Sequence, residues 1–321
     1  MGLGGYLGRR LLLFIPSLLL ASVTIFVIMR ALPGDAAGAM LGGEGESVRP
    51  ELVASLRGEL GLDRPLYVQY GLWLRDMVSG DFGGRSLATR EPVATLVRRT
   101  VLVTLQLTLY AVVVAVVVWV PLGALAAVTR GQWPDVLARA VGLVGAAVPG
   151  FWIAMLVLVA VVRTLGWSPP LGYAHLWIRP LDHIQMMMIP ALVLAWEYGA
   201  HLMRTTRAGM LEALAQDFVR TARSKGLPGW AVTLRHALRA TTIPLVTSAG
   251  LHLGTLLSGA ILLEFVFGLP GLGRALVSAV QARDYPVVQS LAMLLVAGVL
   301  LLNLLIDLVY ALADPRVSYG D

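Results

Sequence analysis

Long runs of apolar residues alternate with shorter polar segments along the whole chain. The clearest run, residues 101–128, contains no charged side chain. A helix needs about 20 such residues to cross the hydrocarbon core of a bilayer. The pattern therefore predicts an all-α membrane protein with about six transmembrane helices, at about 11–32, 101–128, 136–164, 186–206, 243–267 and 287–312.

The composition agrees with this pattern. Hydrophobic residues make up 57% of the chain, charged residues 14%, and the mean hydropathy is +0.77, whereas soluble domains are about 45–50% apolar and about 25% charged. The first run follows Arg9 and Arg10 as a signal peptide would, but its apolar stretch is too long for one, so we expect a retained helix. The chain has no cysteine, which excludes disulfides and thiolate metal sites.

The segment between the first two runs, residues 33–99, has the spacing of a small helical region. Apolar residues recur at helical intervals in two stripes separated by Gly61: Leu52, Leu56 and Leu60, then Tyr67, Tyr70, Leu74 and Met77. We expect a helical cap outside the membrane. Such a cap would either shield the ends of the membrane helices or dock a partner.

The distribution of charge predicts the orientation. Residues 204–239 carry seven basic and two acidic side chains, whereas residues 31–99 carry eight basic and nine acidic ones. Because Lys and Arg collect in cytoplasmic loops, we expect the 204–239 segment, the 129–135 loop and both termini in the cytoplasm. The expected organisation is an N-terminal end with the first span (1–32), an outer helical segment (33–99), a five-span core (100–312) with a cytoplasmic loop at about 207–242, and a cytoplasmic tail (313–321).

The loop at about 207–242 has the pattern of two short helices. One helical face is predicted by apolar residues at steps of three and four: Leu211, Leu214, Phe218 and Ala222. Gly226 is expected to end this helix and Pro228 to begin the next. A helix-turn-helix for DNA is disfavoured because the bilayer tethers the loop at both ends. Contact with anionic lipid headgroups and docking of a cytoplasmic partner remain as alternatives.

Several segments, taken in order, resemble one family. They are RTARSKGL at 220–227 followed by RHALRATTIPLVT, with LPGD at 32–35, LGLDRPLYVQY at 60–70, GDFG at 80–83, PGFW at 149–152, GLPGLGR at 268–274, RDYPVVQ at 283–289 and NLLIDLVYALADPR at 303–316. Their order and spacing resemble the permeases of type I ABC importers, specifically the dipeptide/oligopeptide/nickel family. The resemblance covers nearly the whole chain.

The resemblance implies a type I permease fold whose cytoplasmic loop carries a coupling helix that sits in a groove of an ATP-hydrolysing subunit. The implied coupling residues are Leu214, Asp217, Phe218, Arg220, Thr221, Ala222, Arg223, Lys225, Gly226 and Leu227. The loop departs from the general Glu-Ala-Ala pattern, because Arg220, Thr221 and Ala222 stand at those positions. This departure is the one expected of the peptide/nickel branch.

The same resemblance implies the partners. They are a second homologous permease subunit, two ATP-binding subunits, an extracytoplasmic solute-binding protein and the lipid bilayer of the bacterial inner membrane, with no nucleic acid. The chain is expected to be no enzyme and to hold no cofactor, since nothing in it matches G-x-x-x-x-G-K-[ST], the loop that cradles ATP phosphates. ATP and Mg are expected on the partner ATPase subunits.

Ionisable residues inside predicted spans mark candidate positions on the transport path, because each costs roughly 2.5–3.5 kcal/mol on insertion scales. Glu197 is the clearest case, and His201 shares its helical face. His252, Thr255 and Ser258 form a polar stripe on the fifth span. These five residues are the predicted substrate path. Alternatively they only join helices, with Glu197 paired to His201 or to the partner permease.

The solute is predicted as a dipeptide, an oligopeptide or nickel. PLYVQYGLWL, WPD at 133–135 and GLHLGTLLSG resemble nickel permeases slightly more closely than dipeptide ones. His175, His183 and Met186–Met188 offer nitrogen and thioether groups to a passing metal, although such residues also occur as interfacial groups, and no metal site is assigned. Glu197 could equally meet the ammonium group of a peptide.

Two other classes of function are alternatives to a permease subunit. An ion-coupled secondary transporter would use Glu197 and Asp307 as ion sites, but the docking loop and the lack of an obvious internal repeat argue against it. An intramembrane hydrolase would use Ser248 and His252, but no third orienting group accompanies them.

Overall fold

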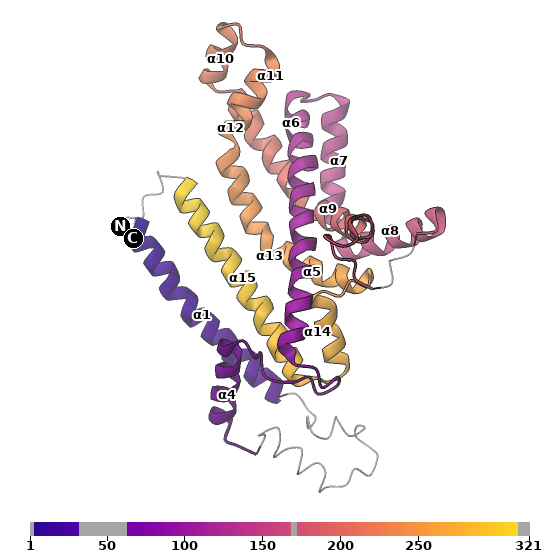
Figure 1. Ribbon diagram of the computed structural model, residues 1–321. Coiled ribbons are helices and arrows are strands. Elements are labelled where there is room, and N and C mark those ends of the chain that lie inside the picture. The colour runs from indigo at the N-terminus through magenta and orange to yellow at the C-terminus, as the bar shows by residue number, and fades with distance from the viewer. Residues whose placement is uncertain (1–2, 32–62, 168–171, 314–321) are drawn as a thin grey trace. The chain divides into compact units, whose positions relative to one another are not determined.

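The computed structural model describes residues 3–31, 63–167 and 172–313 (Figure 1). These residues form helices and connecting turns, and no β-strand occurs among them. The predicted stripe Leu52, Leu56 and Leu60 and the tail 314–321 lie outside the described residues. The chain divides into two compact units, one built mainly from residues 104–269 and the other from residues 8–103 and 270–301.

Five described helices are long and apolar enough to cross a membrane: Gly8–Ala31, Val93–Val128, Pro180–Leu214, Thr242–Val266 and Tyr285–Leu308. A sixth span is possible if α7 (Trp133–Ala147) and α8 (Gly150–Leu165) count together. The prediction of an all-α protein with about six spans is therefore confirmed.

The span predicted at 136–164 is not one continuous helix. α7 and α8 meet at an angle of 106°, and Figure 1 shows α8 turning away from the direction of α7. The cause is Pro149, whose ring disfavours helical backbone at the preceding residue. Val148 is accordingly extended, with φ −97° and ψ 125°, and a new helix starts at Gly150.

In the first unit, the long helix α9 (Pro180–Leu214) contacts α6 (Val120–Val128), α7, α8 and α13 (Thr242–Val266). Glycines permit some of these close contacts. A Cβ atom on Gly199 of α9 would lie 2.1 Å from Cδ1 of Trp119. Trp119 ends a π-helical turn, Ala115–Trp119, between α5 (Val93–Val114) and α6. Pro121 follows it and lacks the N–H group that a regular α-helix needs there.

Short helices connect α9 to α13. They are α10 (Asp217–Ser224), α11 (Gly229–Ala231), a π-helical turn (Val232–Ala237) and α12 (Leu238–Ala240). Because α9 continues to Leu214, the connection occupies residues 215–241 rather than beginning near 207. Figure 1 shows α10 and α11 at one end of this unit, beyond the ends of α6 and α7.

The second unit contains α1 (Leu3–Ala31), α4 (Leu66–Ser79), α14 (Leu272–Gln281) and the adjoining parts of α5 and α15 (Tyr285–Ala313). The second predicted stripe forms α4. Tyr70, Leu74 and Met77 pack around a core of Phe26, Trp73 and Met293. Tyr67, the remaining member of the stripe, is 77% exposed and does not join this core.

A buried carboxylate organises the loop that precedes α5. Asp284 is 3% exposed. It accepts a hydrogen bond from Ser86 Oγ at 2.5 Å and from the backbone N–H groups of Leu87 and Ala88 at 3.1 and 3.3 Å. These bonds satisfy the carboxylate and join the loop to the start of α15, as buried charges require.

Candidate coupling surface and transport cavity

The connection between α9 and α10 differs from the predicted single helix. α9 ends at Leu214, Gln216 is extended with ψ 152°, and α10 begins at Asp217. An acidic residue in the first turn favours a helix start, because the N-terminus of a helix carries partial positive charge. Leu214 and Phe218 therefore lie on different helices, and the predicted common face from Leu211 to Ala222 is wrong.

One side of α10 is buried and holds the element in place. Val219 and Ala222, which are 1% and 5% exposed, pack with Val232 and against Leu214. Ala222 and Leu214 therefore lie at the packed side of α10 and hold the helix in place. Among the implied coupling residues, these two are the ones that are not exposed.

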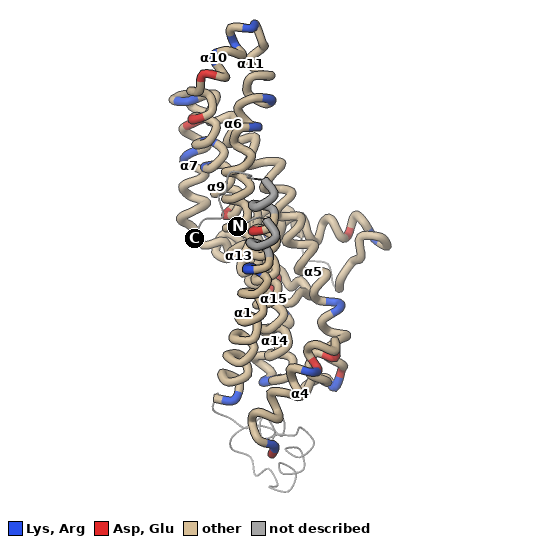
Figure 2. Tube along the Cα trace, turned by 90° about the vertical axis from the view of Figure 1, so that its left-hand side faces the viewer, with Lys and Arg blue, Asp and Glu red and all other residues tan. Residues whose placement is uncertain are grey.

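The remaining side of α10 and the following turn are exposed. Phe218, Leu227 and Trp230 expose 43%, 40% and 65% of their surface. The other predicted coupling residues are also exposed: Asp217, Arg220, Thr221, Arg223, Lys225 and Gly226. Figure 2 shows Lys and Arg along α10 and the turn that follows it. We name Phe218, Leu227, Trp230, Arg220 and Arg223 the coupling surface.

The turn between the two short helices forms as predicted. Gly226 has φ +75°, a left-handed conformation that glycine adopts without steric cost. Its N–H group bonds to the carbonyl oxygen of Arg223 at 2.9 Å, and Pro228 precedes the first residue of α11. The coupling surface thus combines exposed apolar side chains with exposed basic ones, as protein-docking sites do.

A buried ion pair joins α7 to α9 close to the end of α9 at Leu214. It was not predicted from the sequence. Asp135 of α7 is 1% exposed and accepts two hydrogen bonds from Arg207 of α9, at 2.6 Å from Nε and 3.0 Å from Nη2. Gly131 N–H donates a third bond at 2.9 Å, and Arg139 lies 3.6 Å away. The pair ties α7 to α9 two turns before α9 ends.

Two of the residues considered for a metal are buried in the packed interior, His183 and Met187. His183 is fully buried, and its two ring nitrogens contact the Tyr110 hydroxyl at 2.9 Å and the carbonyl oxygen of Ala174 at 2.8 Å. Met187 is also fully buried. Across the described residues, no three His, Cys, Asp or Glu side chains lie together as metal ligands would.

The structure brings two predicted path residues together. His201 of α9 and His252 of α13 stack with ring centroids 4.1 Å apart. His201 Nδ1 also lies 2.9 Å from Arg204 Nη2. Among the described residues, no hydrogen bond or ion pair joins Glu197 to His201, the predicted alternative pairing. Ser248, considered as a nucleophile, instead shares a hydrogen bond of 2.9 Å with Thr205.

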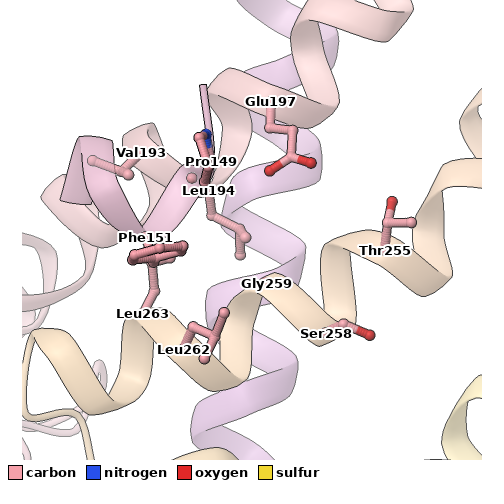
Figure 3. Close-up of a pocket in the computed structure, with 11 residues that line it drawn as sticks. Pro149, Phe151, Val193, Leu194, Glu197, Thr255, Ser258, Gly259, Leu262 and Leu263 are labelled. Carbon is pink, nitrogen blue, oxygen red and sulfur yellow. The ribbon is translucent and has the colours of Figure 1, made fainter. Parts of the chain in front are cut away.

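The other three predicted path residues line one cavity. Glu197, Thr255 and Ser258 lie around a space of about 270 Å³ between α8, α9 and α13. Figure 3 shows the Glu197 side chain extending from α9 toward the part of α13 that carries Thr255 and Ser258. The remaining walls are mainly apolar: Pro149, Phe151, Val193, Leu194, Leu262 and Leu263.

The bend between α7 and α8 forms one wall of this cavity. The backbone of Gly150, the first residue of α8, lies so close to Glu197 that a Cβ atom there would be 3.1 Å from Oε2. A carboxylate is favoured beside the N-terminus of a helix. Among the described residues, none forms an ion pair or hydrogen bond with Glu197. The cavity is thus lined mainly by apolar side chains, with one carboxylate at its edge.

Comparisons with known proteins agree over nearly the whole length. Residues 119–319 match the family described as binding-protein-dependent transport system inner membrane component, and residues 5–108 match the N-terminal region of such membrane components. A Brucella suis protein that carries the name of a peptide transport system permease is 39% identical over 311 residues, which are 97% of this chain and 98% of the relative. The glutathione transport system permease protein GsiC of Escherichia coli K12 is 40% identical over 314 residues, 98% of this chain and 99% of the relative.

Proposed function

Because the chain belongs to the ABC importer permeases of the peptide/nickel family, the inner membrane components of binding-protein-dependent transport systems, we propose that it forms half of the pathway through which an ATP-driven importer takes up peptides. The solute class follows the names of the relatives, which refer to peptide and glutathione transport. The partners are a second permease subunit, two ATPase subunits that hold ATP and Mg, and an extracytoplasmic binding protein.

The observation that carries this proposal is the placement of two features along α9. The exposed coupling surface follows the end of α9 at Leu214, and the cavity lies against its middle at Glu197. A long helix transmits a displacement at one end to the other because its backbone hydrogen bonds resist bending. A displacement of α10 by a bound ATPase would therefore be transmitted along α9 to the cavity.

Peptide is favoured over nickel on the chemistry of the cavity. Nickel prefers imidazole nitrogens and other N or S donors, whereas carboxylates and hydroxyls suit harder ions. The cavity offers one carboxylate and two hydroxyls, and His183 is occupied by Tyr110 and Ala174. The sequence-based preference for nickel therefore gains no support, and we propose peptide as the solute.

Reconstitution tests the function directly. Proteoliposomes that contain the four membrane-associated subunits and the binding protein are expected to accumulate radiolabelled glutathione or dialanine only when ATP is supplied to the ATPase side. The purified single chain is expected to hydrolyse no ATP. Hydrolysis by the single chain, or peptide uptake driven by a sodium or proton gradient without ATP, would contradict the proposal and favour the secondary transporter.

The orientation gives a further prediction. We expect α10, and both chain termini, on the cytoplasmic side because basic residues dominate this connection. A cysteine at Ala215, which is exposed between α9 and α10, should react with membrane-impermeant maleimides only in inside-out vesicles. A cysteine at Gly45 should react only from the outside. The parent chain has no cysteine and serves as the control, and reversed labelling would overturn the orientation.

A further inference from the structure

The polar side chains of the cavity can accept hydrogen bonds but have no free hydrogens to donate. Glu197 contributes a carboxylate, and Thr255 and Ser258 contribute hydroxyl oxygens. Thr255 Oγ1 already donates its hydrogen to the carbonyl oxygen of His252 at 2.7 Å, and Ser258 Oγ donates to that of Gly254 at 3.1 Å. Only lone pairs therefore remain on both hydroxyls. The described lining includes no Lys, Arg or His.

We propose that this cavity is a binding subsite for the protonated amine end of the transported solute, a proposal that rests on the function given above. An alkylammonium group has three hydrogen-bond donors and no acceptor, which is the complement of a carboxylate and two acceptor hydroxyls. An anionic group would meet repulsion from Glu197 and find no donor among the side chains of the lining. Glu197 is thus the charge-recognising residue, with Thr255 and Ser258 as further acceptors.

The local environment leaves the carboxylate able to bind a cation. The N-terminus of α8 beside it carries only about half of an elementary positive charge. That partial charge favours a carboxylate but does not neutralise it, and the described residues provide no other cation partner. Glu197 is exposed, so its carboxylate is accessible to a cation that enters the cavity.

The dimensions indicate how much of the solute enters. The cavity of about 270 Å³ lies just below the range of about 300–1,000 Å³ that is typical of pockets for whole ligands. It therefore accommodates one end of a peptide: the amine and the adjacent side chain. The apolar walls formed by Phe151, Leu194 and Leu262 would contact that side chain (Figure 3).

A single thiol in the cavity provides a direct test. Leu262 lines the cavity and is 50% exposed, and the parent chain contains no cysteine. In the assembled transporter carrying Leu262→Cys, a cationic aminoethyl thiosulfonate should modify the permease chain about tenfold or more faster than an anionic sulfonatoethyl reagent, because a local carboxylate concentrates cations. Adding Glu197→Gln should remove this preference.

Protection by solutes identifies the group that binds. Dialanine should slow modification of Leu262→Cys, whereas N-acetyl-dialanine, which lacks the ammonium, should not. Tyr67→Cys is the matched control, because Tyr67 of α4 is 77% exposed and belongs neither to the cavity lining nor to the coupling surface. Its reagent preference should be unchanged by Glu197→Gln and its modification unaffected by either peptide.

Several results would overturn the subsite. These are equal rates for the two reagents with Glu197 intact, no modification of Leu262→Cys at all, or equal protection by both peptides. Protection by sodium or calcium chloride without protection by dialanine would instead indicate a metal-ion site. ATP-dependent uptake by the same preparation separates the two proposals, since uptake without amine preference contradicts only the subsite, and absence of uptake contradicts the proposed function.

Discussion

Replacing Phe218 with alanine is expected to weaken binding of the ATPase subunits by about 2 kcal/mol or more, which corresponds to roughly thirtyfold in the dissociation constant. Docking energy at protein interfaces comes mostly from a few apolar or aromatic anchors that become fully buried. Phe218 is 43% exposed in the permease alone, although its neighbour Val219 is 1% exposed. The ring is therefore available to a partner, and α10 is held in place by other residues.

The matched control is Arg223→Ala on the same helix. Arg223 is exposed, and a charge at the rim of an interface mainly affects the encounter rate and its dependence on salt. We expect it to cost less than Phe218→Ala, with the difference from the parent shrinking as salt screens the charge. Val219→Ala serves a different purpose, because it should disturb the support of α10 rather than its outer face.

Co-purification of the solubilised permease with its ATPases, at low and at high salt, measures both variants. If α10 instead lies against anionic lipid, each basic residue near the surface contributes about 1 kcal/mol and the ranking reverses. Retention of the ATPases by Phe218→Ala together with their loss from Arg223→Ala would exclude the anchored docking surface.

The sequence predicted the helices well because the bilayer requires apolar runs of about 20 residues, and these stand out from the polar segments between them. It also located the turn at Gly226 and Pro228, since both residues restrict the backbone locally. The break between α9 and α10 was missed because Ala215 and Gln216 carry no such local signal. A helical periodicity continues through them, and only tertiary packing of Val219 against Val232 decides where α10 lies.

Contacts between distant residues were the least predictable. Glu197 was selected because a carboxylate in a span is expensive, and the structure places it at a cavity. Its neighbours there, Gly150 and Phe151, depend on the 106° bend at Pro149. Pro149 is evident in the sequence, but membrane helices often tolerate proline. Its presence alone therefore did not predict so sharp a bend.

The pair Asp135 and Arg207 shows the same limit of sequence reasoning. The two residues are separated by 72 positions, and each also fits a simpler role. Asp135 follows Trp133 and Pro134 as an acidic residue in the first turn of a helix does. Arg207 is one of seven basic residues between positions 204 and 239, a cluster expected near a cytoplasmic loop. Only the packing of α7 against α9 shows that the two charges neutralise each other.

Breaking this pair is expected to have the second large effect. Removing one partner of a buried ion pair costs about 3–5 kcal/mol, because it leaves the other charge buried without compensation. Arg207→Ala should be the more damaging single change, since Asp135 is 1% exposed whereas the Arg207 side chain is 21% exposed. Arg207→Lys should recover only part of the loss, because lysine cannot make the bidentate contact.

The double variant Asp135→Asn with Arg207→Gln separates a specific pair from general damage to the helices. It removes both charges and keeps hydrogen-bonding groups, so its thermal midpoint in detergent should lie above that of Arg207→Ala. Arg139→Ala is the control, because a contact of 3.6 Å from a side chain that is 55% exposed contributes about 1 kcal/mol or less. A double variant less stable than both Asp135→Asn alone and Arg207→Gln alone would contradict the pairing.

The same variants connect stability to transport. α7 runs from Asp135 to the bend beside Glu197, and α9 runs from Glu197 past Arg207 to the coupling surface. The ion pair therefore joins the two helices, α7 and α9, that connect the coupling surface with the cavity. If this connection transmits motion, Arg207→Lys should retain ATPase binding but show less solute uptake per ATP hydrolysed than the parent. Unchanged uptake per ATP, together with a lowered thermal midpoint, would limit the pair to a structural role.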